Sequence, residues 1–175
     1  MPIAVEDIGN RFARVHSPKK KRCMILSNVK ELIGLEFKPY SYGVEKGKIQ
    51  ELAAAIGDDN PIYYSLEAAR QKGYEGIPIP LTYLQVIDLF GGYGFEEKIR
   101  KLKLNPVKIL HGEQAYEYLG EIYAGDELTV TSKVINSETK SGSTGGMDLV
   151  TIENRYRNQR GELVAIAKST IVHRH

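Results

Sequence analysis

Asp58 and Tyr63 are the two residues of this chain whose types and spacing point most directly to acid–base chemistry. They stand five residues apart within residues 56–64 (IGDDNPIYY). A carboxylate can hold a water molecule and accept a proton from it, whereas a phenol, with an ordinary pKa of about 10, is neutral at pH 7. The pair suggests a site where a carboxyl holds water and a hydroxyl orients it or donates a proton.

A loop between two helices is predicted to carry both side chains. Residues 46–56 (KGKIQELAAAI) have apolar side chains at the i, i+3, i+4 and i+7 spacing of an amphipathic helix, and Gly57 is expected to end it. Ser65 can cap a second short helix, which Gly73 would stop. Side chains on such a loop can be aimed at a cleft.

Residues 81–90 (LTYLQVIDLF) predict a helix that is apolar on nearly all sides. Its polar exceptions, Thr82, Gln85 and Asp88, recur every three residues and form one narrow stripe. Because so apolar a helix is unstable in water, we expect other structure to wrap it and place it at the centre of the domain.

The start of that helix is a second place where chemistry is expected. The first N–H groups of a helix have no partner within it and lie at the positive end of its dipole. Leu81, Thr82 and Tyr83 occupy this position, directly after Pro80, which has no N–H to satisfy. Their amides are therefore predicted to suit an oxyanion.

The chain beyond Pro106 is predicted to form strands, at about residues 107–119, 127–136, 148–157 and 163–173. Short, turn-rich connections between them suit antiparallel hairpins, so a four-stranded meander is expected. One earlier strand is predicted at residues 38–44, with Tyr40 and Tyr42 on one side, after a short helix at 28–35 that Asn28 could cap. An antiparallel sheet curling round the apolar helix would cover both, which gives an α+β fold.

Four short segments carry a resemblance to a known family: GDDNP at 57–61, PLTYL at 80–84, HGEQ at 111–114 with Tyr116, and AGD at 124–126. Together they resemble the FAS1-like or MaoC N-terminal branch of the MaoC-like dehydratase superfamily, which includes mycobacterial (3R)-hydroxyacyl-ACP dehydratase subunits. The resemblance covers about residue 29 to the C-terminus. It implies a hotdog fold, in which a five-stranded antiparallel sheet wraps around a central helix.

The resemblance also implies a reaction and a difficulty. Relatives act on 2-enoyl or 3-hydroxyacyl thioesters through an Asp and a His five residues apart, and here Asp58 keeps the first position while Tyr63 replaces the histidine. No cation near Tyr63 in the sequence would lower its pKa, so little hydratase activity is expected from this loop alone. Several members of this branch lack the dyad and supply the acyl-chain channel, while a smaller MaoC-like partner supplies Asp and His.

The predicted catalytic residues are Asp58 and Tyr63, and the predicted substrate-binding residues are Asn60, Leu81, Thr82, Tyr83, His111 and Glu113. Other roles remain open for several of them. Asp58 and Asn60 also fit a turn, and Tyr63 could pack at an interface as well as line an acyl pocket. His111 is expected to share one strand face with Ile109, Glu113 and Ala115, where a satisfied histidine beside a carboxylate is favoured over a thioester site.

No metal site and no cofactor are expected. One cysteine and four scattered histidines give no zinc-type ligand spacing. The Gly91-Gly92-Tyr93-Gly94 cluster follows a predicted helix and not a strand, so it does not fit a dinucleotide-binding loop.

Composition predicts a basic N-terminal extension, residues 1–27, and a single domain, residues 28–175. The net charge is +2, and the run Lys19-Lys20-Lys21-Arg22 lies in the extension. A solvated tail is favoured over contact with nucleic acid, because no nucleic-acid motif accompanies the run. No apolar run is long enough for a membrane span. The single cysteine, Cys23, favours an intracellular, cytoplasmic setting.

We therefore predict an acyl-thioester-binding hotdog subunit of a (3R)-hydroxyacyl-thioester dehydratase or enoyl-thioester hydratase, with acyl-CoA or acyl-ACP as substrate. A hotdog acyl-CoA thioesterase and a non-catalytic acyl-CoA-binding module are the alternatives. Assembly is expected, as a homo-oligomer or as a heteromer with a small MaoC-like subunit, because one curled sheet leaves an open edge strand.

Overall fold

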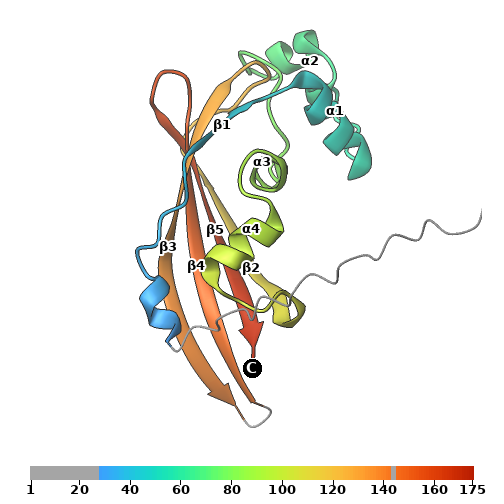
Figure 1. Ribbon diagram of the computed structural model, residues 1–175. Helices are drawn as coiled ribbons and strands as arrows, with labels where there is room; N and C mark the ends of the chain where they lie inside the picture. The colour runs from blue at the N-terminus through green and yellow to red at the C-terminus, as the bar shows by residue number, and fades with distance from the viewer. Residues whose placement is uncertain (1–27, 143–144) are drawn as a thin grey trace, which may run out of the picture.

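A five-stranded antiparallel sheet forms one layer of the protein, and the helices lie against one of its faces (Figure 1). The computed structural model describes residues 28–142 and 145–175 of the chain, and the predicted basic extension lies outside the described residues. The strand order is β1-β3-β4-β5-β2. The strands are β1 (Tyr40–Gly43), β2 (Ile109–Tyr118), β3 (Glu127–Gly142), β4 (Gly145–Arg157) and β5 (Leu163–Arg174). The hotdog fold expected from the sequence is confirmed.

The α-helices are α1 (Lys46–Ala55), α2 (Leu66–Gln71), α3 (Tyr83–Phe90) and α4 (Phe95–Leu102). Short 3-10 turns complete the structure: η1 (Val29–Leu32), η2 (Pro61–Tyr63) and η3 (Pro106–Lys108). α1, α2 and α3 match the predicted helices, whereas α4 was not predicted. Among the described residues, no helix combines the length and the hydropathy needed to cross a membrane.

The expected four-stranded meander is wrong at its first connection. β2 pairs with β5, while β3 pairs with β1 on the other side of the sheet. The linking chain does not form a hairpin because it pairs elsewhere: Ala124 N–H donates to the Ile77 carbonyl, and Ile79 N–H donates to the Ile122 carbonyl, at 2.9 and 3.1 Å. The segment before α3 thus holds the chain while it crosses from one edge of the sheet to the other.

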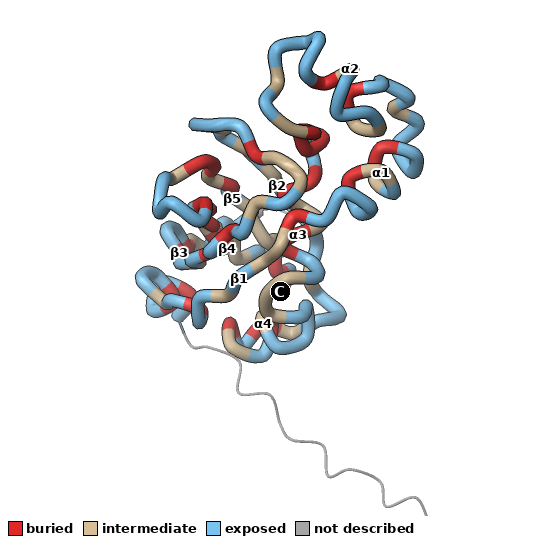
Figure 2. Tube along the Cα trace, turned by 90° about the horizontal axis from the view of Figure 1, so that it is seen from above, coloured by how far each residue is buried: buried red, intermediate tan, exposed pale blue. Residues whose placement is uncertain are grey.

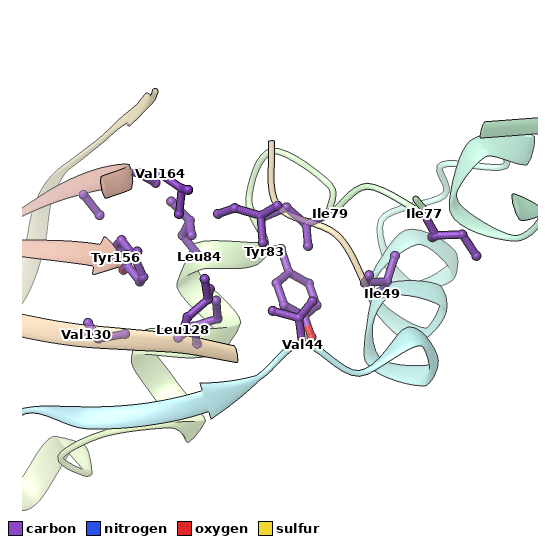
Figure 3. Packing of buried hydrophobic residues seen from close by; sticks show 14 residues of the cluster. Val44, Ile49, Ile77, Ile79, Tyr83, Leu84, Leu128, Val130, Tyr156 and Val164 are labelled. Atoms are coloured by element: carbon purple, nitrogen blue, oxygen red, sulfur yellow. The ribbon is translucent and has the colours of Figure 1, made fainter. Parts of the chain in front are cut away.

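Two clusters of apolar side chains fill the space between the helices and the sheet. Along the strands, buried and exposed residues alternate, so one face of the sheet packs on the helices (Figure 2). The first cluster lies under α3 and reaches α1, as Figure 3 shows, and the second lies under α4. The first includes Ile49, Tyr83, Leu84, Ile87, Leu128, Val130 and Tyr156, and the second includes Phe37, Ile99, Leu102, Val134, Val150 and Ile152.

The sheet packs on one side of α3, as the hotdog fold requires, and part of the opposite side of the helix is exposed. Tyr83, Leu84 and Ile87 are fully buried against the sheet. On the opposite side, Leu89 is 56% exposed and Phe90 is 78% exposed. An apolar face on the central helix is therefore left open.

Asp88 turns toward the sheet and not toward solvent. Its carboxyl oxygen Oδ1 accepts hydrogen bonds from the Tyr156 hydroxyl at 2.6 Å and from the Tyr40 hydroxyl at 3.4 Å. Burial raises the pKa of Asp88, and the Tyr156 hydrogen bond and the nearby Lys98 charge oppose that rise. The polar stripe predicted from the sequence thus includes an internal tether between α3 and the strands β1 and β4.

The Tyr156→Phe variant is expected to lower the free energy of unfolding by about 1–3 kcal/mol, because a buried carboxyl loses its shortest hydrogen bond. Tyr40→Phe should have a smaller effect, since its hydroxyl lies at 3.4 Å and Tyr40 is only partly buried. Urea unfolding of the two variants with unchanged m-values measures the difference. Equal losses from both would contradict the tether assigned to Tyr156.

Candidate functional site

The loop after α1 places Asp58 as predicted. Gly57 adopts a positive φ of 73°, which ends the helix, and Gly57 N–H donates to the Ala54 carbonyl at 3.1 Å. Asp58 N–H donates to the Ala53 carbonyl at 2.8 Å. These two bonds are those of a helix C-terminal cap, and they fix the backbone from which the carboxyl projects.

The Asp58 carboxyl has one occupied oxygen and one open one. Oδ1 accepts a hydrogen bond from Asn60 N–H at 3.1 Å, and the Asn60 side chain in turn accepts one from Ile62 N–H at 3.3 Å, where η2 begins. The Tyr64 hydroxyl donates to the Asp58 carbonyl at 3.1 Å. Asp58 and Asn60 therefore do form turns, and Oδ2 of Asp58 has no hydrogen-bond partner in the described part of the chain.

Tyr63 lies against the first apolar cluster as a neutral phenol. Burial raises its pKa above the ordinary value, and the neighbouring Asp58 carboxylate and Tyr74 raise it further. It packs against the same cluster as Tyr118 of β2. Because both effects keep the proton on the hydroxyl, Tyr63 can donate a hydrogen bond at pH 7 but cannot serve as a general base.

The start of α3 offers fewer donors than predicted. Tyr83 N–H donates to the Pro80 carbonyl at 2.8 Å, and the Tyr83 side chain is fully buried in the first cluster (Figure 3). Thr82 is the N-cap residue and is exposed. For the amides of Leu81 and Thr82, residues 28–142 and 145–175 provide no backbone acceptor. Two of the three predicted oxyanion donors are thus free, and Tyr83 belongs to the core.

Edge strand β2 places two tyrosines against α3; in the sequence, Tyr116 stood out only as part of a motif, and Tyr118 was not singled out. The Tyr118 hydroxyl donates to the Leu81 carbonyl at 2.7 Å, and the Tyr116 hydroxyl donates to Gln85 Oε1 at 3.3 Å. Both rings come from the strand face that looks toward α3. Alternating tyrosines on one predicted strand face were the signal that could have identified them.

His111 and Glu113 lie on opposite faces of β2, which corrects the expectation of a shared face. His111 pairs with Ile171 and Glu113 with Thr170, so a bulge at Gly112 inserts one residue between them. A Cβ atom on Gly112 would lie 2.8 Å from Val172 Cγ2 and 3.0 Å from the Thr170 carbonyl, so glycine fits the tight bulge. Ile109 stays on the His111 face, and Ala115 joins Glu113.

The structure does not bring His111 to the Asp58 loop within one chain. The strand partners of His111 and Tyr118, Ile171 and Ala165, lie six positions apart on β5, which corresponds to roughly 20 Å along β2. Both His111 and Glu113 are exposed. Within one chain the candidate site is therefore the loop with Asp58 and Tyr63, which Asn60 shapes, together with Tyr118 and the start of α3, which the Tyr118 bond to Leu81 connects.

Folding also brings together a cluster that the sequence reasoning missed. Asp148 Oδ2 lies 3.4 Å from His173 Nδ1 and 3.1 Å from His175 Nε2, and the three ligand atoms lie within 4.8 Å of one another. His173 Nε2 accepts the N–H of Asn105 at 3.3 Å, so the neutral ring carries its proton on Nδ1, facing Asp148. The His173 Nδ1–H thus donates to Asp148, and the three side chains form a hydrogen-bonded cluster. The i, i+2 spacing of the two histidines in one strand was the available signal.

Comparisons with known proteins agree with this architecture. Residues 31–167 match the family described as FAS1-like, dehydratase domain region. A UPF0336 protein of Streptomyces avermitilis is 35% identical over 136 residues, which cover 78% of this chain and 86% of the relative.

Two solved complexes of Mycobacterium tuberculosis share the fold. The C-terminally truncated HadBC (3R)-hydroxyacyl-ACP dehydratase complex contains a chain with a TM-score of 0.67 and 25% identity, and the match covers 81% of this chain and 96% of that one. The ChsH1-ChsH2 complex matches with a TM-score of 0.67 at 20% identity, over 83% and 86% of the two chains.

The Asp58→Asn and Asp58→Ala variants distinguish the stability that comes from the turn hydrogen bond to Asn60 N–H from the stability that comes from the negative charge of Asp58. Asparagine keeps an oxygen for Asn60 N–H, so Asp58→Asn should unfold within about 0.5 kcal/mol of the wild type, whereas Asp58→Ala should lose about 1 kcal/mol. Urea denaturation checks both values. A loss in Asp58→Asn as large as in Asp58→Ala would mean that the turn does not depend on this hydrogen bond.

The hydrogen bonds that the Asp148 carboxylate accepts predict a pH-dependent stability. Burial tends to raise the pKa of Asp148, but hydrogen bonds from Thr139, His175 and His173 outweigh it and lower the pKa below its ordinary value. A group with a depressed folded-state pKa stabilises the protein above its unfolded-state pKa, about 3.9, and this stabilisation is lost as the pH falls through the folded-state pKa.

We therefore expect the wild type to be more stable than Asp148→Asn at pH 5, with the advantage shrinking below about pH 4. Unfolding free energies across this range measure it, with Asp59→Asn, at an exposed position, as the control. An advantage that is unchanged at pH 2 would contradict the assignment.

Proposed function

This chain belongs to the FAS1-like dehydratase domain region family, among the MaoC-like hotdog dehydratases, and on that premise we propose that it is an acyl-thioester-binding subunit of a (3R)-hydroxyacyl-thioester dehydratase or enoyl-thioester hydratase. A partner subunit supplies the Asp and His dyad. Acyl-CoA or acyl-ACP is the substrate class, and a cytoplasmic setting follows from the single cysteine.

The neutral Tyr63 beside the half-open carboxyl of Asp58 is the observation that carries this proposal. Adding water to an enoyl thioester needs a base for the water, an acid for C2 and donors for the carbonyl that becomes enolate-like. Asp58 can hold the water, Tyr63 can orient it, and the free amides of Leu81 and Thr82 can contact the carbonyl. The imidazole that completes proton transfer in a dyad has no equivalent in this loop.

Partner binding is supported by two surfaces that a single chain leaves open. β2 is an edge strand, with unpaired backbone groups along its outer side. Leu81, Leu89 and Phe90 also leave apolar surface on and next to the central helix exposed. A second hotdog subunit joined at β2 would extend the sheet and cover part of this face, as a second copy or as a dyad-bearing homologue. The HadBC and ChsH1-ChsH2 structures are complexes of two different subunits.

Assembly also gives His111 a place in the proposal. Antiparallel pairing of two β2 strands about their middle brings His111 of one copy toward the Tyr116 and Tyr118 end of the other, because the two strands run in opposite directions. His111 and Ile109 lie on the face that looks toward the helices, whereas Glu113 lies on the outer face. His111 of one copy would therefore contact the thioester site of the other copy across the interface. Glu113 would contact the substrate at the rim of the interface, on the outer face of the sheet.

A non-catalytic acyl-CoA-binding module is the second candidate, and the same tyrosine favours it. If no partner with an intact dyad exists, a protein that holds thioesters without a base binds acyl-CoA and releases it unchanged. Turnover distinguishes the two functions.

The test is crotonyl-CoA hydration by the chain alone, by the chain with a dyad-bearing partner, and by the Tyr63→His variant. The wild type alone should bind crotonyl-CoA with little turnover. Tyr63→His should raise the rate by about 10²-fold, the lower end of the general acid–base contribution. Tyr63→Phe is the matched control and should remain inactive.

Binding without turnover in every mixture would support the module. Absence of crotonyl-CoA binding, measured by calorimetry with the folded wild type, would overturn both functions. A folded Tyr63→His variant with an unchanged rate would show that this loop lacks more than its imidazole.

A further inference from the structure

The Tyr118 hydroxyl reaches across from the edge strand to the turn that begins α3. It donates to the Leu81 carbonyl at 2.7 Å, a short hydrogen bond between segments 37 residues apart. Tyr118 is held firmly, since it pairs with Ala165 of β5 at the end of β2. Burial raises the pKa of Tyr118, so its hydroxyl remains a donor at neutral pH.

This hydrogen bond determines the direction of a neighbouring donor. The Leu81 carbonyl and the Thr82 N–H belong to one planar trans peptide unit, in which the two groups point in opposite directions. A hydroxyl that holds the carbonyl toward β2 therefore aims the Thr82 N–H away from β2. In the described part of the chain this N–H has no backbone acceptor, whereas the next one, of Tyr83, is already bonded to the Pro80 carbonyl.

Apart from the turn that the Tyr83 N–H closes on the Pro80 carbonyl, little restrains this peptide unit. The Leu81 side chain is 72% exposed, and Thr82 makes no side-chain cap bond at the helix start. Without the Tyr118 hydroxyl, only the turn would hold the unit, and a tilt of the Leu81 carbonyl would redirect the Thr82 N–H. A redirected N–H would stabilise an oxyanion less well than a correctly aimed one.

We propose that Tyr118 is a positioning residue that orients the Thr82 N–H toward the carbonyl oxygen of a bound acyl thioester. The proposal rests on the proposed function, and it deepens it by assigning the carbonyl-recognising donor and the side chain that sets its direction. Tyr118 touches neither the thioester nor the water in this arrangement. It acts through the peptide unit between Leu81 and Thr82.

The chain offers a matched control on the same strand. Tyr116 lies two residues before Tyr118 and also donates a hydroxyl bond to the α3 region, at 3.3 Å. Its acceptor is the Gln85 side chain, however, so it restrains no peptide unit at the helix start. Tyr116→Phe and Tyr118→Phe remove the same atom from neighbouring positions, and only the second frees the Leu81 carbonyl.

The experiment compares two probes that differ in one carbonyl: butyryl-CoA, a thioester, and S-butyl-CoA, the corresponding thioether. The wild type should bind the thioester more tightly. In Tyr118→Phe the affinity for butyryl-CoA should fall about five- to tenfold, the loss expected for one hydrogen bond, with the affinity for S-butyl-CoA unchanged. Tyr116→Phe should keep the wild-type preference. Calorimetry gives the affinities, and thermal unfolding confirms that each variant is folded.

The Thr82 amide resonance gives a second readout, which a purely structural role of Tyr118 would not move. In the wild type it should shift with butyryl-CoA and not with S-butyl-CoA, and in Tyr118→Phe the thioester-specific shift should disappear. A folded Tyr118→Phe that keeps the full thioester preference would overturn the positioning role. So would a wild-type Thr82 resonance that responds equally to both probes, and this measurement holds even if Tyr118→Phe fails to fold.

Failure of the proposed function has a different signature. In that case the wild type binds neither probe, and the Thr82 amide of the free protein becomes the measurement. An unchanged free-state Thr82 resonance in Tyr118→Phe would then overturn the positioning role as well. A shift seen in Tyr118→Phe and not in Tyr116→Phe would support control of the peptide unit by Tyr118.

Discussion

The hydrogen bond between the Tyr156 hydroxyl and the Asp88 carboxyl is the constraint on which the rest of this structure depends. Apolar contacts are not directional, so on their own they would let α3 rotate or slide on the sheet. A 2.6 Å bond from the fully buried Tyr156 fixes the rotation of α3 about its own axis. Since an unsatisfied buried carboxyl is costly, other rotations of α3 are disfavoured. Because this contact orients α3, it also orients the turn at residues 80–82, where the helix starts.

Local features of the fold could be predicted because local chemistry decides them. Gly57 and Gly73 both adopt positive φ, as the helix ends assigned to them require, and the Ser65 side chain caps α2. Non-local features could not. The strand order follows from where residues 119–126 pair, and the bulge at Gly112 changes the face of each later residue in β2. α4 was not predicted because glycines precede it and most of its residues are charged. Only two of its residues, Ile99 and Leu102, are buried, which is too few to give a clear apolar stripe.

The site residues that lie close together in the sequence could be predicted. Those that folding brings in from distant segments could not. Asp58, Asn60 and Tyr63 share one short loop, so their proximity needed no knowledge of the fold. Tyr118 comes from the far edge of the sheet, and a single sequence holds no signal for its contact with Leu81. His111 is the opposite case. Its motif predicted a place at the site, but roughly 20 Å of strand separates it from Tyr118 in the same chain.

The unequal lengths of β1 and β3 affect how copies of this protein can associate. β1 pairs with residues 127–130, residues 34–37 hydrogen-bond to β3 as far as Val134, and β3 continues to Gly142. The uncovered length of β3 carries Glu138 and Lys140, which pair with each other at 3.2 Å, and charged side chains on an edge discourage strand addition. Within the described residues the two edges of the sheet thus differ: the outer side of β2 is unpaired along its whole length, whereas only the end of β3 beyond Val134 is uncovered. In the proposed assembly, pairing through β2 alone would end with a closed pair and would not propagate into a fibre.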